Sequence, residues 1–266
     1  MSRFHLWLKD QNMEAEQVRY ADMLVYMKHW QKQGVSQRTV QSYLNCVKKF
    51  YDYLVDGKRV KTNPLLNIKV QGVKRRTLYH IFEPHELHAI YHSYPSEKLH
   101  ERRNKVMIGL LVYQGLKSED LFRLETNDIK LREGKVEVHG SRKTNARTLQ
   151  LESYQMMDMY DYVTKARAEI VQKSGEKTER LFVGAEGGQH QQRFLEIALK
   201  TVRKQHPKLK DAKQIRACVI AKWLRQHNLR EVQYLAGHRY ISATEAYQQN
   251  EMEGLTEEVN MFHPLG

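Results

Sequence analysis

The chain has 266 residues, of which 41% are hydrophobic, and this length predicts roughly two domains with ordinary packed cores. No apolar run approaches the ~18 residues that a membrane helix needs, and the charged N-terminus favours neither a membrane anchor nor a signal peptide. Cys46 and Cys218 match no zinc or redox spacing, and we expect a cytoplasmic protein. The net charge of +13, with a pI of about 9.6, indicates a polyanionic partner.

The charge is unevenly distributed along the chain. Residues 56–77 and 197–216 each carry seven Lys or Arg residues against a single Asp. Residues 245–266 reverse the sign, with five Glu and no Lys or Arg. This distribution favours a surface that faces nucleic acid and a tail that avoids it. The alternative is a protein that is merely basic and soluble.

The first part of the chain has the pattern of a helical module. Apolar residues recur at three- and four-residue spacing over residues 17–33 and again over residues 40–54. Ser36 is a good N-cap for the second helix, and Gly57 is a good residue for its C′ position. Residues 69–79 combine one Gly with four basic residues and no period, which predicts a linker.

The rest of the chain combines helices with one β element. Residues 135–139 and 148–151 alternate around a polar turn and predict an antiparallel hairpin, while residues 181–183 predict a third strand. The fold class is therefore mainly α: a helical domain over residues 1–73, then an α+β domain over residues 80–266 with a small three-stranded antiparallel sheet. Helices of this second domain are expected at about 84–94, 98–114, 118–124, 153–173, 191–204, 211–227, 229–236 and 241–248.

Polar residues that helix packing does not require occur in four separated segments. They are Gly115-Leu116-Lys117 with Asp120-Leu121, Arg142-Lys143-Thr144, Lys213-x-x-Arg216, and Leu235-Ala236-Gly237-His238 with Tyr247 nine residues later. In this order the segments resemble the tyrosine recombinases, or phage-type integrases. The resemblance runs from about residue 14 to His263-Pro264 and includes Asn63-Pro64, which commonly ends the helical core-binding domain of that family.

The resemblance implies a fold, a reaction and partners. It implies a SAM-like, core-type DNA-binding domain over residues 1–73 and a catalytic DNA breaking and rejoining domain over residues 80–266. In the family a Tyr oxygen attacks a DNA phosphate, forms a 3′-phosphotyrosyl link and releases a 5′-hydroxyl, with no cofactor and no metal. We therefore expect a site-specific DNA recombinase of a mobile element that acts on double-stranded DNA as a homo-oligomer, a synaptic tetramer.

The same resemblance assigns roles to single residues. Tyr247 is the nucleophile, and Arg216 binds a non-bridging phosphate oxygen. His238 donates to the phosphate or orients the Tyr. Lys143, at the hairpin turn, is the general acid that protonates the leaving oxygen. Lys213 occupies the position where the family often has His.

Lys117 departs from the family pattern, which has Arg at this position. Lys keeps the charge but loses the planar two-pronged geometry of a guanidinium. Either Lys117 suffices, or Arg123 or Arg142 assists it, or the chain is a cleavage-impaired DNA-binding protein of the same fold. Arg142 is also a rival for the role of Lys143. A more distant alternative is a topoisomerase-like enzyme, which shares the chemistry but relaxes supercoils as a monomer.

The acidic tail, residues 245–266, carries Leu255, Val259 and Phe262 at helical spacing. In the family this region commonly docks onto a neighbouring subunit. We therefore expect the tail to pack on the next catalytic domain in a cyclic assembly on DNA. The alternative is that it packs on its own domain.

Three histidines are spaced so that they could share one helix face. His85, His88 and His92 could in that arrangement bind a metal. Because no Cys lies near them and the family chemistry needs no metal, we interpret them as surface residues.

Overall fold

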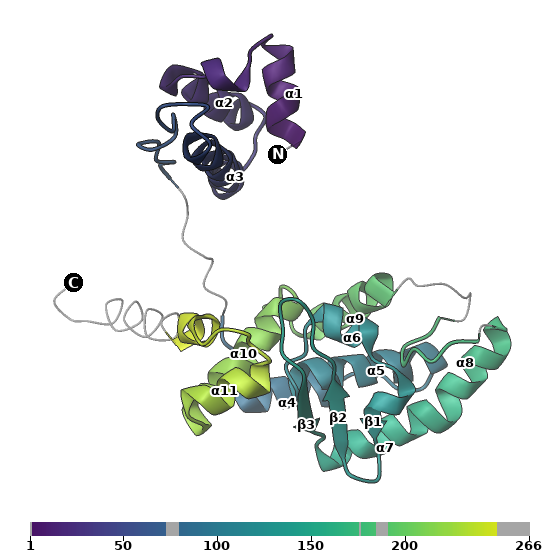
Figure 1. Ribbon diagram of the computed structural model, residues 1–266. Coiled ribbons are helices and arrows are strands. Elements are labelled where there is room, and N and C mark those ends of the chain that lie inside the picture. The colour runs from purple at the N-terminus through teal and green to yellow at the C-terminus, as the bar shows by residue number, and fades with distance from the viewer. Residues whose placement is uncertain (1, 73–79, 176, 185–190, 249–266) are drawn as a thin grey trace. The chain divides into compact units, whose positions relative to one another are not determined.

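The protein was analysed as a computed structural model, which divides into two compact units, Met1–Thr77 and Leu78–Gly266 (Figure 1). The described residues are mainly helical and contain one three-stranded antiparallel sheet, which confirms the predicted fold class. None of the helices among them is both long and apolar enough to cross a membrane. The structure describes residues 2–72, 80–175, 177–184 and 191–248.

The N-terminal unit begins with a helix that the sequence pattern did not predict. Phe4 and Trp7 of this helix are buried, and their rings lie 5.3 and 5.1 Å from that of Tyr26. Phe4, Trp7 and Leu8 fall at helical spacing, and aromatic contacts with later residues stabilise the helix. The helices of this unit are α1 (Ser2–Asp10), α2 (Tyr20–Lys32) and α3 (Gln37–Asp56), with a 3-10 turn at Ala15–Gln17.

The ends of α3 follow the predicted capping at one end only. Ser36 Oγ accepts a hydrogen bond from the Thr39 amide, as an N-cap should. At the other end Gly57 has a φ of −78°, so it does not need to be glycine. The left-handed residue is Lys58, with a φ of 55°. The C′ position predicted for Gly57 is therefore occupied by Lys58.

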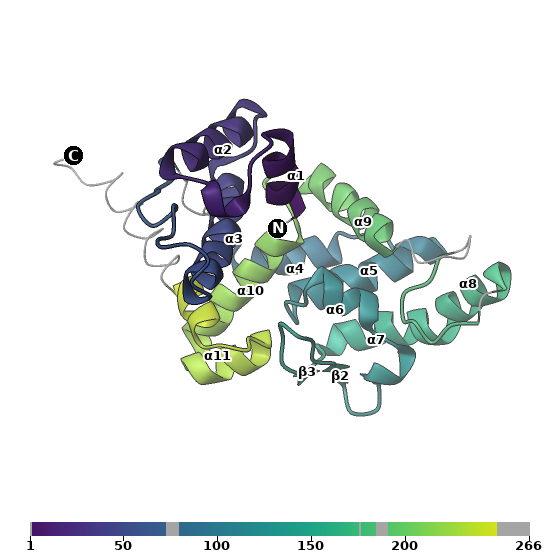
Figure 2. The ribbon, with the colours of Figure 1, turned by 45° about the horizontal axis from the view of Figure 1, so that its top comes forward.

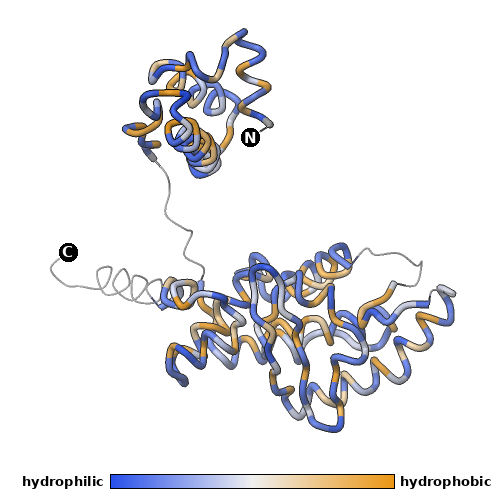
Figure 3. The backbone as a smooth tube through the Cα atoms, in the orientation of Figure 1, coloured by the Kyte–Doolittle hydropathy of each residue, from blue (hydrophilic) through white to orange (hydrophobic). Residues whose placement is uncertain are grey.

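Helix α5 runs through the core of the C-terminal unit. Met107, Ile108, Leu110 and Leu111 are fully buried, and α5 contacts α4, α7, α9 and α10. Figure 3 shows apolar positions along these helices. The helices are α4 (Pro84–His92), α5 (Leu99–Val112), α6 (Ser118–Arg123), α7 (Ser153–Asp161), α8 (Arg167–Ser174), α9 (Gln191–Gln205), α10 (Ala212–Gln226) and α11 (Leu229–Ala236), with a π-helical turn at Tyr162–Ala166 between α7 and α8.

The sheet contains the predicted hairpin but a different third strand. Its strands are β1 (Ile129–Lys130), β2 (Lys135–Val138) and β3 (Arg147–Gln150), in the order β1-β2-β3. Residues 181–183 are not a strand, so that prediction was wrong. They are buried in the core, where the Leu181 carbonyl accepts from the Tyr162 hydroxyl, and burial alone explains their apolar character. A two-residue strand such as β1 is too short to show a period.

The arrangement of α10, α11 and the hairpin positions the candidate site. Helix α10 packs on α4, α5 and α11, and α11 in turn contacts β3 (Figure 2). Residues 242–248 continue the chain as a further helical segment. The segments that carry the four sequence blocks therefore meet in one unit.

Candidate active site

Arg216 joins three of the four sequence blocks. Its side chain projects from α10 and is buried, with 4% of the residue exposed. The guanidinium donates to the backbone carbonyls of Gly115 and Ala236, the latter at 2.7 Å. Its Nε has no hydrogen-bond partner among the described residues, although it is buried. The guanidinium thus connects the block of Gly115 with the block of Ala236 and retains one donor.

Helix α10 places Arg216 on its buried face. The Asp211 side chain caps its first turn by accepting from the Gln214 amide at 2.9 Å. Ile215 and Cys218 are buried beside Arg216, so this face of the helix points into the core. Lys213 lies nearly one turn earlier and is exposed. The structure therefore does not place Lys213 among the buried groups of the site.

His238 is held by hydrogen bonds at both ring nitrogens. Its Nε2 lies 3.2 Å from Nη2 of Arg216, and its Nδ1 lies 2.9 Å from Oγ1 of Thr244. Because a guanidinium can only donate, Nε2 accepts, and Nδ1 carries the proton and donates to Thr244. Burial and the nearby cations, Arg216 first among them, lower the pKa of His238 to about 3. The imidazole is therefore neutral near pH 7, and in this geometry its one ring proton points to Thr244.

Tyr247 lies over this histidine. The two rings stack with centroids 5.6 Å apart and planes 16° from parallel. Burial lowers the pKa of Arg216, and Tyr247 opposes this shift through its charge and through a side-chain hydrogen bond to the guanidinium. The phenol oxygen is thus adjacent to Arg216. Thr244, which sequence reasoning missed, lies one helical turn before Tyr247 and is fully buried.

Lys117 is half-buried at the N-cap of α6. Burial lowers the pKa of this Lys, the charges of Arg216 and Arg147 lower it further, and Asp120 partly opposes them. The turn before it needs glycine, because Gly115 has a φ of +55° and a Cβ there would lie 3.0 Å from Val219. The backbone thus brings Lys117 into the electrostatic range of Arg216.

The hairpin turn that carries Lys143 is docked against the His238 turn. Thr144 is buried and forms a β-bridge with His238. On the other side of the turn, Nη1 of Arg239 donates to the Arg142 carbonyl at 2.8 Å. Lys143 and Arg142 are both exposed. The turn therefore brings Lys143 next to the site, with its side chain in contact with solvent.

Arg147 is a buried guanidinium that sequence reasoning also missed. It is the first residue of β3, where burial alternates, and it occupies an inward-facing position. Its Nη2 lies 3.0 Å from Asp120, which also accepts from Arg123 at 2.8 Å. A charged residue in phase with the inward-facing Leu149 was the signal that could have revealed it. Arg123, expected as a possible helper of Lys117, is instead a partner of Asp120 and has a partly exposed side chain.

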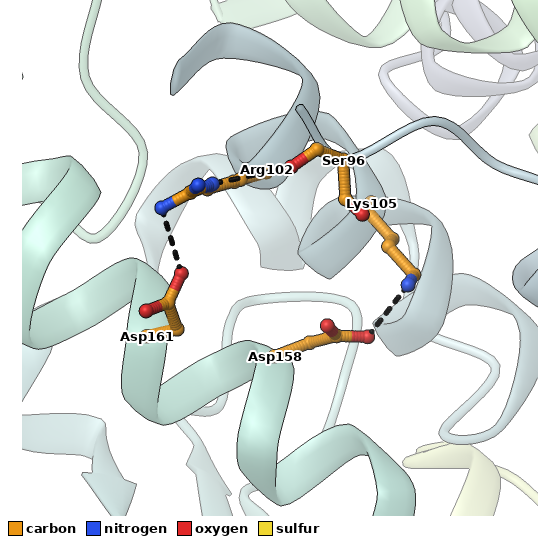
Figure 4. Close-up of a pocket in the computed structure, with 5 residues that line it drawn as sticks. All are labelled: Ser96, Arg102, Lys105, Asp158 and Asp161. Atoms are coloured by element: carbon orange, nitrogen blue, oxygen red, sulfur yellow. Dashed lines mark hydrogen bonds and ion pairs between the residues drawn. The ribbon is translucent and has the colours of Figure 1, made fainter. Parts of the chain in front are cut away.

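One further cluster of charged residues is separate from the predicted site residues. Figure 4 shows a pocket lined by Ser96 and two ion pairs: Arg102 lies 3.0 Å from Asp161, and Lys105 lies 3.1 Å from Asp158. Its charges are thus paired with one another, and none of the predicted site residues lines it.

Two histidines of α4, His88 and His92, belong to an aromatic cluster. The rings of His88 and His92 have centroids 4.0 Å apart, and Nδ1 of His88 lies 3.0 Å from the Tyr113 hydroxyl. Within the described ranges, no three His, Cys, Asp or Glu side chains are grouped so that they could hold a metal ion.

Comparison with known proteins identifies the family. The sequence profile of the phage integrase family matches residues 80–253. The chain belongs to this family, the tyrosine recombinases. It is 24% identical to the tyrosine recombinase XerC of Bacillus subtilis, over 99% of this chain and 88% of that protein. It is also 24% identical to the tyrosine recombinase XerD of Oceanobacillus iheyensis, over 99% of this chain and 89% of that protein.

Solved structures of tyrosine recombinases share the fold. The XerH site-specific recombinase bound to palindromic difH substrate, in a post-cleavage complex, matches with a TM-score of 0.72 and 15% identity, over 97% of this chain and 76% of that chain. The Tn1549 transposon integrase in complex with a circular intermediate DNA matches with a TM-score of 0.70 and 16% identity, over 91% of this chain and 87% of that chain. At these identities the likeness shows the fold alone.

Proposed function

We propose that this tyrosine recombinase is a site-specific DNA recombinase whose nucleophile is Tyr247. The observation that carries the proposal is the contact of the Tyr247 side chain with Arg216, a buried cation that retains an unpartnered donor. A nucleophile beside a preplaced guanidinium is what attack on a phosphate requires, because negative charge builds on the non-bridging oxygens. The names of XerC and of the XerH–difH complex support the same activity.

In the proposed reaction Arg216 and Lys117 bind the non-bridging oxygens of the scissile phosphate. The Tyr247 oxygen forms a bond to phosphorus, and the bond from phosphorus to the 5′-oxygen breaks. Lys143 gives a proton to the 5′-oxygen and the phenol releases its proton to water, so the step consumes no net proton. Neutral His238, stacked on the phenol, orients it. The covalent link conserves the bond energy, so the reverse step rejoins a strand.

Domain roles and assembly belong to the same proposal. We assign residues 1–73 to core-type DNA binding and residues 80–266 to DNA breaking and rejoining. The net charge of +13 supports contact with duplex DNA. The recombinase would act as a synaptic tetramer and serve a mobile element. Lys213, exposed on α10, would contact the DNA backbone beside the scissile phosphate.

The test is covalent capture on a nicked duplex. The substrate carries the element end mapped beside the gene, with a nick that lets the cleaved 5′ fragment diffuse away. We expect wild-type protein to accumulate an adduct and Tyr247→Phe to form none, while both bind the DNA. Tyr240→Phe is the matched control, because Tyr240 lies seven residues before Tyr247 and is 69% exposed. An adduct formed by Tyr247→Phe at the wild-type rate would remove Tyr247 from this role.

A cleavage-impaired DNA-binding protein of the same fold is the second candidate. The observation that favours it is Lys117, which cannot form the two parallel hydrogen bonds of an Arg and whose pKa is lowered by burial and nearby cations. Site-specific DNA binding by the wild type without any adduct would support this candidate. A third possibility, a topoisomerase-like activity, would show as relaxation of supercoiled DNA that lacks the specific site.

A further inference from the structure

Arg147 lies in a completely buried position beneath the candidate site. Its side chain has 0% exposure, and its ion-pair partner, the Asp120 side chain, has 1%. Only Nη2 is engaged, at 3.0 Å from Asp120. Nε and Nη1 are buried and have no hydrogen-bond partner in the part of the chain that the structure describes. Buried donors without acceptors are costly, so this arrangement needs an explanation.

The guanidinium of Arg147 lies directly against the turn that presents His238. A Cβ added to Gly237 would lie 2.4 Å from Nη1 and 2.9 Å from Cζ of Arg147. The Gly237 carbonyl in turn accepts from the Asn145 amide at 3.1 Å, two residues before Arg147. The position of the turn, and therefore of His238, depends on where this guanidinium lies.

The charge of Arg147 acts on the groups proposed to hold the phosphate. Burial has the largest effect on the pKa of Lys117, of Arg216 and of His238, and the charge of Arg147 lowers each of these pKa values further. Lys117, Arg216 and Arg147 thus form one cation cluster, and Asp120 is the buried carboxylate paired with it. An incoming phosphate would relieve the mutual repulsion of these cations.

We infer that Arg147, held by Asp120, is a positioning residue for the scissile phosphate and supplies the buried guanidinium charge that compensates for Lys at position 117. This inference rests on the proposed function. Because Arg147 pairs with the buried Asp120 and packs against Gly237, it acts through the His238 turn and through its charge rather than by contact with the phosphate. Arg123 and Arg142 are weaker candidates because both are solvent-accessible, and water screens exposed charges.

The first measurement is the single-turnover rate of adduct formation on the nicked duplex at saturating protein. We expect Arg147→Met to lower this rate roughly 10- to 100-fold, in the range seen when groups behind a reactive site are removed, with little change in DNA affinity. Arg147→Lys keeps the charge and should lose less. Arg123→Met is the matched control, because it removes the other partner of Asp120 from the exposed side, and it should stay within about twofold of wild type.

The second measurement separates compensation from a structural role. Lys117→Arg should increase the rate of adduct formation more in the Arg147→Met variant than in wild type, because it supplies a guanidinium where Arg147→Met has removed one. A merely structural defect in Arg147→Met would not be rescued in this way. Circular dichroism and melting of each variant establish that it is folded. Should Arg147→Met not fold, Arg147→Lys with and without Lys117→Arg provides the same comparison.

The third measurement needs no activity. Competitive acylation of the lysines as a function of pH, without DNA, reports the pKa of Lys117, which should rise in Arg147→Met. Wild type that forms no Tyr247-dependent adduct would refute the proposed function, while this pKa shift still tests the charge of Arg147. An unchanged Lys117 pKa, a rate loss within twofold, or equal effects of Lys117→Arg in both backgrounds would overturn the inference.

Discussion

Replacing Gly237 by Ala tests the packing of the His238 turn against Arg147. Gly237 is the C-cap of α11 with a φ of 65°, a backbone conformation that costs a residue with a side chain about 1–2 kcal/mol. The new Cβ would also lie 2.4 Å from Nη1 of Arg147, so the guanidinium would have to move. Gly175→Ala is a matched control: Gly175 is the C-cap of α8 with a φ of 66°, and no described atom lies within 4 Å of its added Cβ.

The magnitude follows from the ion pair that the displaced guanidinium would break. Losing one partner of a buried ion pair costs about 3–5 kcal/mol. Arg147 stays in the site in this variant, so we expect the lower end, about 3 kcal/mol, beyond the conformational cost. Gly175→Ala should therefore lose about 1–2 kcal/mol and Gly237→Ala about 4–5 kcal/mol. For a unit of this size, each kcal/mol lowers the melting temperature by about 2–4 °C.

Differential scanning calorimetry of the full chain measures both variants. Gly175→Ala identifies the transition of the C-terminal unit, because Gly175 lies in that unit. We expect Gly237→Ala to lower the same transition by about twice as much or more. Equal shifts for the two variants would show that Arg147 does not occupy the space beside Gly237, and the reasoning about this turn would be wrong.

Further predictions concern His238, DNA affinity and the tail. Thr244→Val removes the acceptor of the Nδ1 proton of His238, and urea unfolding should show a loss of about 1–3 kcal/mol. His238 has a folded-state pKa lowered from 6.5 to about 3, so the unfolded state binds the extra proton between these values. The contribution of neutral His238 to the free energy of unfolding is complete above pH 6.5 and is lost as the pH falls towards 3, by up to about 1.4 kcal/mol per pH unit. His238→Asn should flatten this pH dependence, and an unchanged slope would contradict the low pKa. The logarithm of DNA affinity should fall with the logarithm of salt concentration by about 0.9 per phosphate contacted, and a slope near zero would argue against a DNA-facing basic surface. The tail beyond residue 248 lies outside the described residues; truncation after residue 250 should spare binding to single sites and weaken synapsis of paired sites, measured by gel shift.

Local pattern was sufficient for much of the fold. The longer helices from α2 onwards and the hairpin of β2 and β3 could be predicted because they carry a period within their own residues. Strand β1 has two residues and is too short for a period, and helix α1 is stabilised by aromatic contacts with Tyr26. Residues 181–183 show the converse error, because burial in the core produces the same apolar run as a strand.

The candidate site, too, could be predicted only in part from the sequence. Tyr247, His238, Arg216, Lys117 and Lys143 could be proposed from ordered motifs, and their catalytic roles stay predictions. Tertiary structure alone brought Lys117, Arg216 and His238 into one cluster and left Lys213 exposed.

The strand alternation could place Arg147 on the inward face, but the partners of Arg147 and Thr244 could not be read from the sequence. Arg147 pairs with Asp120, 27 residues away, and packs under a glycine 90 positions later in the chain. Thr244 has an unremarkable place in a short helix, and its importance depends on which nitrogen of His238 faces Arg216. Such roles arise from burial and from hydrogen-bond geometry between distant segments, which no local period records.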